Sequence, residues 1–190
     1  MIDNIEIKII ENNHLNELAV ISAECFVNDE YFDYLSQYKE EKYKLLKKIY
    51  FEGLKIPFEI GYIAGVFCNN KLIGYASVVD WTKLKQNPNY FKQLFNSESE
   101  FSNDIKTFVE KANKVKNADY LLSICILPNY QQNGLGTKLI KFILKREKTL
   151  ISDIDNINSL SIYKKLSFDI EKISEKIYFV HKKRIKNFEL

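Results

Sequence analysis

Apolar residues recur along this 190-residue chain with two periods, one typical of strands and one typical of helices. The stretch Ile5–Ile10 predicts a strand, and Leu15–Phe26 predicts a helix because Leu15, Leu18, Ala19 and Ser22 fall on one face. A second helix is predicted over residues 40–54. We expect it to end at Gly53 and Pro57, which cannot continue a helix.

Two apolar runs rich in β-branched and aromatic residues follow, over 61–67 and 72–79. The short polar segment Asn69–Lys71 separates them, and asparagine tolerates the positive φ that a tight turn demands. This pattern predicts a β-hairpin.

The second half of the chain alternates between extended and helical patterns. Residues 87–116 contain polar turns and one amphipathic helix around 104–115, and residues 120–127 are apolar on both alternating faces, as in a central strand. Further strands are predicted over 150–154, 168–170 and 176–180, and further helices over 134–146 and 157–166. A strand, helix, strand, helix run after a hairpin predicts an α+β fold with a mixed, mostly antiparallel central sheet flanked by helices and one parallel crossover. No repeat or linker interrupts it, so we expect one domain over 1–190.

Composition excludes several other classes of protein. With 46% hydrophobic and 14% aromatic residues, the chain has enough apolar surface to fold. The longest apolar run, 121–127, is far shorter than the ~20 residues of a membrane span. The first ten residues lack the pattern of a secretory signal, and the three cysteines form no CxxC pair, so we expect no disulfide framework, no metal site and a cytoplasmic location.

Charge is unevenly divided along the chain. Residues 1–60 carry 7 lysines and 12 acidic residues, a net charge of −5, and the remainder carries +8. This division suits an anionic ligand toward the C-terminal part and a cationic one toward the acidic N-terminal part, where Tyr31, Phe32, Tyr34 and Tyr38 also lie; solvated surface charge is the alternative interpretation. The basic residues form no stripe, so we expect no nucleic-acid partner.

The most informative segment is the loop that follows the 120–127 strand. Gly134 and Gly136 stand at the start of a predicted helix, where free backbone amides and the helix dipole bind phosphate oxygens. Leu139 takes the place of the third glycine of a dinucleotide-binding fingerprint, and Thr137–Lys138 does not follow the order of a P-loop, so neither nucleotide-binding motif is favoured. A tight turn that needs small residues is the purely structural alternative.

A second pair of residues lies further along. Asn156 and Tyr163 are seven residues apart, which places them on one face of the predicted 157–166 helix, about 10.5 Å from each other. Both could line one groove. Each also has a structural interpretation, Asn156 as a helix N-cap and Tyr163 as a core aromatic residue.

Together these residues resemble the signature of the GNAT superfamily of acyl-CoA-dependent N-acetyltransferases. That signature is Arg or Gln, two residues, Gly, one residue, and Gly or Ala, after a strand that ends near a proline; residues 131–136 after Pro128 match it. The family pattern continues with an Asn, a Tyr seven residues later and a step similar to Leu-Gly-Phe, in the places of Asn156, Tyr163 and Leu166–Phe168. Here Ser167 replaces the usual glycine.

The resemblance covers about residues 118–170 and implies a GNAT-like fold with splayed central strands. It also implies acetyl-CoA as co-substrate, with its diphosphate held by loop amides and its pantetheine paired with the preceding strand. Gln132 and Asn133 replace basic residues often found in the loop, so diphosphate binding would depend more on backbone amides. The implied cofactor-binding residues are Cys125, Ile126, Leu127, Gln131, Gln132, Asn133, Gly134, Leu135, Gly136, Thr137, Asn156 and Ser159.

The implied reaction is direct attack by a primary amine of a small molecule or peptide in a ternary complex, with Tyr163 protonating the leaving thiolate. The general base is not identified: Glu24, Glu59 and Asp80 are candidates, and a water relay is an alternative. Trp81 is either an acceptor-pocket or a core residue. An acyl-CoA-binding sensor or interaction domain without catalysis is the alternative function. We expect no membrane partner, and either a monomer or a homodimer.

Overall fold

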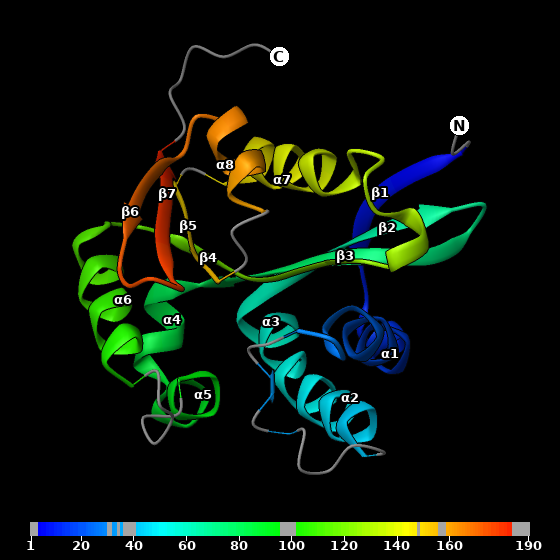
Figure 1. Cartoon of the computed structure of the whole chain (residues 1–190), viewed down its shortest axis with the longest axis horizontal. Helices are drawn as coiled ribbons and strands as arrows, with labels where there is room; N and C mark the ends of the chain where they lie inside the picture. The colour runs from blue at the N-terminus through cyan, green and yellow to red at the C-terminus, as the bar shows by residue number, and fades with distance from the viewer. Residues whose placement is uncertain are drawn as a thin grey trace. The chain divides into compact units, whose positions relative to one another are not determined.

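The computed structural model describes residues 4–29, 32–33, 35, 41–95, 102–147, 149–155 and 159–183 (Figure 1). The chain forms two compact units. The first comprises 1–79 and 123–142, and the second comprises 80–122 and 143–190. The strands follow the sheet order β1-β2-β3-β4-β5-β7-β6, with mostly antiparallel pairs, which confirms the predicted α+β class. The expectation of a single domain stays a prediction.

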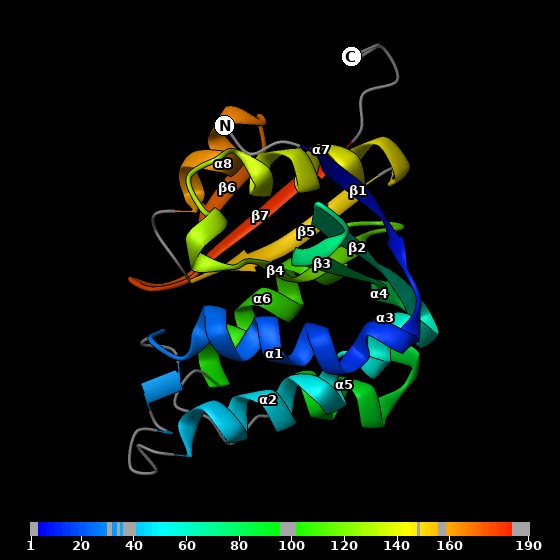
Figure 2. The same ribbon diagram turned by 90° about the vertical axis from the view of Figure 1, so that its right-hand side faces the viewer.

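The first unit begins with an antiparallel arrangement of β1 (Ile5–Ile10), β2 (Gly61–Cys68) and β3 (Lys71–Asp80). Asn69 and Asn70 form the turn with φ of 49° and 65°, as the sequence predicted. Helices α1 (Leu15–Phe26) and α2 (Lys42–Gly53) pack side by side below these strands (Figure 2). Core residues of this unit include Leu18, Ile21, Ile63, Tyr75 and Cys125.

One prediction in the first unit was wrong. Helix α2 ends at Gly53, but the chain forms another short helix, α3 (Lys55–Ile60), instead of leaving helical structure at Pro57. Pro57 is the third residue of α3. A proline is tolerated there because the first turn of a helix has no intrahelical partners for its backbone N–H groups.

The second unit contains two helices that the sequence analysis missed, α4 (Trp81–Gln86) and α5 (Pro88–Leu94), before the predicted α6 (Ser102–Lys114). Each missed helix starts at a side-chain cap. Asp80 Oδ1 accepts hydrogen bonds from the backbone N–H groups of Thr82 and Lys83 at 2.8 and 3.0 Å, and Asn87 caps α5. Helices of six and seven residues are too short to show a clear apolar period.

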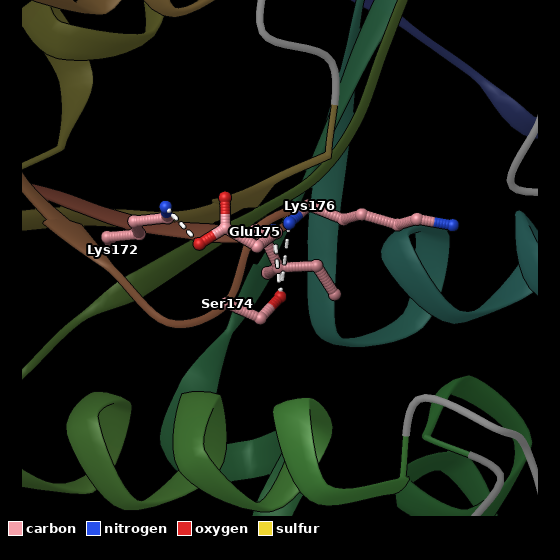
Figure 3. A network of polar contacts seen from close by, with 5 residues as sticks. Lys172, Ser174, Glu175 and Lys176 are labelled. Carbon is pink, nitrogen blue, oxygen red and sulfur yellow. Dashed lines mark hydrogen bonds and ion pairs between the residues drawn. The ribbon is translucent and has the colours of Figure 1, made fainter.

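Strands β5 (Thr149–Ile154), β6 (Asp169–Lys172) and β7 (Tyr178–Lys183) complete the second unit, with α8 (Leu160–Lys165) between β5 and β6 in sequence. Polar contacts organise the β6–β7 turn (Figure 3). Lys172 Nζ lies 2.7 Å from Glu175 Oε1, and Ser174 Oγ accepts hydrogen bonds from the N–H groups of Lys176 and Ile177 at 3.3 and 3.2 Å.

Strand β4 (Asp119–Ile126) and β5 pair in parallel at only two positions, Asp119↔Leu150 and Tyr120↔Ile151. Strand β5 remains paired with β7 as far as Ile154. The parallel contact is therefore short, as the predicted splaying of these strands requires.

An aromatic cluster fills the core of the second unit. Trp81 is 1% exposed and makes edge-to-face contacts with Phe95, Phe108 and Tyr120, and Phe108 also contacts Phe179. Trp81 is thus a core residue, the second of the two interpretations that its position allowed. None of the described helices is long and apolar enough to cross a membrane.

Candidate active site

The predicted glycine loop lies in the first unit, where β4 leads through a short 3₁₀ turn (Pro128–Tyr130) to α7 (Leu135–Arg146). The side chains of Gln131 and Asn133 fold back on the backbone. Gln131 Nε2 donates to Ile126 O at 2.9 Å, and Asn133 Nδ2 donates to Gln131 O at 2.8 Å. These bonds occupy backbone carbonyls, and so they fix the course of the loop.

The start of α7 presents backbone N–H groups. The bond from Lys138 N to Gly134 O, 3.0 Å long, is the first of the helix, so the amides of Leu135, Gly136 and Thr137 precede the hydrogen-bonded ladder. Leu135 is 3% exposed and anchors the turn, whereas residues 131–134 are exposed. Gly134 has a φ of +73°, and a Cβ placed there would meet nothing within 4 Å. An open loop with these amides suits phosphate oxygens.

The strand before the loop is already partly bonded within the protein. Ile126 O accepts the Cys25 thiol at 3.3 Å as well as Gln131, and Leu127 N donates to Ile73 O at 2.9 Å. These contacts use two of the backbone groups around Cys125, Ile126 and Leu127 that the resemblance assigns to pantetheine. Pairing with pantetheine stays a prediction, and it would use other groups of this segment.

A solvent-accessible cavity of about 550 Å³ adjoins the end of β4 in the first unit. Its lining comprises Glu24 of α1, Lys71 of β3 and the segment Leu127–Tyr130. Glu24 is exposed, as is the second candidate base Glu59 at the end of α3. The third, Asp80, is the cap of α4 described above. Tyr31, Tyr34 and Tyr38 lie outside the described residues.

Tyr163 lies on α8 in the second unit and is 1% exposed. Its hydroxyl group has no hydrogen-bond partner among the described residues. Burial, together with the nearby charge of Asp153, raises the pKa of the phenol, and the neighbouring Ser152 hydroxyl only partly offsets this rise. Tyr163 therefore keeps its proton at neutral pH, as a general acid must before it acts.

The predicted helix around Tyr163 is shorter than expected. It begins at Leu160, and Ser159 is its N-cap residue. Asn156 lies outside the described residues, so its assigned role and its position relative to Tyr163 stay predictions. The predicted start at residue 157 also falls outside the described part of the chain.

Tyr120 and Asp153 form a polar pair that the sequence analysis missed. The Tyr120 hydroxyl donates to Asp153 Oδ1 at 2.7 Å in the second unit. The two residues belong to different strands 33 positions apart, so only the register of the sheet brings them together. Among the described residues, no group of three or more His, Cys, Asp or Glu side chains could hold a metal ion.

Comparison with known proteins agrees with this geometry. The chain belongs to the acetyltransferase (GNAT) family, whose model matches residues 23–168. No curated protein sequence matches the chain at a significant level.

Solved structures with low sequence identity share the fold. Arylalkylamine N-acetyltransferase 2 from Aedes aegypti is 13% identical, with a TM-score of 0.67 over 95% of this chain and 99% of that one. PH1933 from Pyrococcus horikoshii OT3 is 16% identical, with a TM-score of 0.62 over 96% and 99%. PaiA N-acetyltransferase from Thermoplasma acidophilum, solved in complex with coenzyme A, is 18% identical, with a TM-score of 0.55 over 95% and 99%.

Proposed function

We propose that this protein transfers an acetyl group from acetyl-CoA to a primary amine of a small molecule or a peptide. The observation that carries the proposal is the 131–137 loop, which is exposed over 131–134 and leads into α7 with backbone amides that precede the helical ladder, in a chain of the acetyltransferase family. The similar structures support the proposal, since one contains coenzyme A and another is an arylalkylamine N-acetyltransferase.

The amides at the start of α7 hold the diphosphate of acetyl-CoA, and the amine attacks the thioester carbonyl carbon directly. Tyr163 gives its proton to the departing thiolate, which makes the thiolate a better leaving group. Cys125 is 2% exposed, and burial raises the pKa of its thiol well above the usual range. A buried neutral thiol is a poor nucleophile, which favours direct transfer over a cysteine-bound intermediate.

Substitution of Tyr163 by Phe tests the acid role. The hydroxyl has no partner among the described residues, so its removal leaves no buried group unsatisfied and should not weaken the fold. We expect Tyr163→Phe to lower kcat by about 10²-fold while the Kd for acetyl-CoA changes by less than about threefold. Coenzyme A release and calorimetry measure the two quantities. Tyr178→Phe on β7 is the matched control, and full turnover by Tyr163→Phe would contradict the role.

A thermal shift experiment separates an enzyme from a sensor. Acetyl-CoA at 100 times its Kd should stabilise the protein by about 2.7 kcal/mol, which is a rise in Tm of about 5–10 °C. An enzyme also releases coenzyme A with a suitable amine, for which phenethylamine, spermidine and agmatine are the probes. A rise in Tm without release across the amines favours the sensor, and no rise in Tm contradicts both functions.

A further inference from the structure

Strand β5 has an unusual edge beyond its two parallel pairs with β4. After Ile151, its residues pair with β7 on one side, and on the other the Ser152 hydroxyl donates to Leu121 O at 2.9 Å. The Ser152 side chain thus makes the contact to β4 that a backbone hydrogen bond of the ladder would otherwise make. Asp153 follows at once, beyond the last residue of β5 that pairs with β4.

Asp153 is accessible to solvent but held in place. It is the one exposed residue of β5, where the other five residues are buried. Its Oδ1 accepts the 2.7 Å hydrogen bond from Tyr120, whose side chain is 3% exposed within the aromatic cluster. One rigid donor orients the carboxylate, and a carboxylate with about four lone-pair sites can still accept a further proton or hydrogen bond.

We propose that Asp153 is the general base that takes the proton from the attacking amine, and that Tyr120 is the residue that positions it. This inference rests on the acetyltransferase function proposed above. It adds a catalytic residue that the glycine-loop signature does not contain. Asp80, by contrast, is used as a helix cap.

The electrostatic surroundings of Asp153 fit this role. Desolvation by the surrounding protein raises the pKa of Asp153, although the residue as a whole is exposed, and the Tyr120 hydrogen bond partly lowers it. The carboxylate is therefore a stronger base than an ordinary aspartate. Its charge also contributes, after burial, to the raised pKa of Tyr163, so the phenol is held in its protonated form.

The groups around Asp153 come from several elements. Asp153 pairs with the apolar Phe179 of β7, so β7 places no charged residue directly opposite Asp153. Further along β7, His181 lies 3.8 Å from both Asp169 and Glu171 on β6. The titratable or charged groups to be considered in a pH profile are Tyr120 on β4, Tyr163 on α8, Asp155 after β5 and His181 on β7.

The proton balance closes over one turnover. A neutral amine forms its N–C bond to the acetyl carbon and loses one proton to Asp153, while the C–S bond breaks and its electron pair goes to sulfur. Tyr163 protonates that sulfur. A proton then passes from the Asp153 carboxylic acid to the Tyr163 phenolate, directly or through solvent, and both groups return to their starting states.

The test compares the full-length wild type with Asp153→Asn and Tyr120→Phe, using acetyl-CoA and whichever of phenethylamine, spermidine and agmatine supports release of coenzyme A. We expect Asp153→Asn to lower kcat by about 10²-fold or more, with the Kd for acetyl-CoA changed by less than about twofold. Tyr120→Phe removes the bond that lowers the pKa of Asp153, so the acidic limb of the kcat profile should move to higher pH. The amine is the same in every profile, so its own titration does not affect the comparison.

Asp169→Asn on β6 is the control for loss of an exposed carboxylate and should change kcat by less than about twofold. The inference is overturned if Asp153→Asn keeps more than half of kcat. It is also overturned if the acidic limb of Tyr120→Phe stays at the wild-type pH, which decides the matter should Asp153→Asn not fold. A wild type that binds acetyl-CoA but transfers to no amine would instead overturn the proposed function, and the assigned base with it.

Discussion

Gly134 and Gln132 both adopt positive φ within one loop, at +73° and +61°, but only the glycine does so without strain. A Cβ at Gly134 would meet no atom within 4 Å, so the effect of a substitution there comes from the backbone conformation alone. A substitution of Gly134 therefore tests the backbone geometry of the loop without changing its packing.

We expect Gly134→Ala to destabilise this loop by about 1 kcal/mol and to weaken acetyl-CoA binding by about fivefold. Gln132→Gly is the matched variant, because it relieves the same strain two residues earlier and should leave binding unchanged or slightly stronger. Calorimetry with acetyl-CoA measures both. Equal affinity of Gly134→Ala and the wild type would mean that the left-handed backbone at this position has no part in binding.

At the scale of single elements, the end of α8 shows how a departure from the family pattern is accommodated. Ser167 has a φ of +57° where the family usually has glycine. Its N–H donates to Lys164 O at 3.0 Å and that of Phe168 donates to Tyr163 O at 3.0 Å, which together form a Schellman motif. Lys182 Nζ also donates to Ser167 O at 3.1 Å, so a long side chain supports the cap.

This cap also fixes the candidate acid, because Phe168 packs edge-to-face on Tyr163 with ring centroids 5.1 Å apart. Ser167→Gly removes the left-handed strain of about 1 kcal/mol, less the entropy that glycine gains in the unfolded chain, for a net stabilisation of about 0.5 kcal/mol. Lys164→Gly inside α8 should instead destabilise the protein by up to about 1 kcal/mol. Urea unfolding followed by Trp81 fluorescence compares them, and a destabilised Ser167→Gly would contradict the argument.

Elements that depend on local pattern could be predicted, and contacts that depend on register could not. The bounds of β1 and α1 match the prediction, since their apolar spacing is regular, and the turn at Asn69 and Asn70 follows from asparagine chemistry. The candidate loop could also be predicted, because Gly134 and Gly136 lie directly at the start of the helix that follows the loop. The pairing of Tyr120 with Asp153 leaves no local signal, since it arises from the alignment of two strands.

At the scale of the whole molecule, a shared fold is compatible with low sequence identity, because the regular pattern of apolar positions sets the elements. The compared structures retain TM-scores of 0.55–0.67 at 13–18% identity. A sheet with flanking helices requires only that apolar positions keep their period, which many sequences satisfy. The proposed reaction would tolerate fewer changes than the fold, because it would depend on a few groups such as the loop amides.

The stability of the molecule should also depend on pH through a carboxyl group outside the candidate site. Asp119 at the start of β4 shares a cavity of about 290 Å³ with Glu147 and Asp80. Burial, followed by the hydrogen bond and charge of Glu147 and the charge of Asp80, raises the pKa of Asp119 from 3.8 to about 8. The group therefore stays protonated at neutral pH and acts as a hydrogen-bond donor to its neighbour.

Between the two pKa values the folded protein holds a proton that the unfolded chain has released, so stability falls as the pH rises from about 4 to about 8. Asp119 is only half-buried, so solvent screens its interaction with Glu147. We therefore expect the free energy of unfolding to fall by only about 1 kcal/mol across this pH window. Asp119→Asn keeps a donor without a titrating proton and should be more stable than the wild type at pH 8 but not at pH 4. Trp81, whose backbone N–H donates to Ala118 O at 3.1 Å next to Asp119, reports unfolding by fluorescence in urea. If the free energies of unfolding of the two proteins changed with pH in the same way, Asp119 would ionise alike in the folded and unfolded states, which would contradict this prediction.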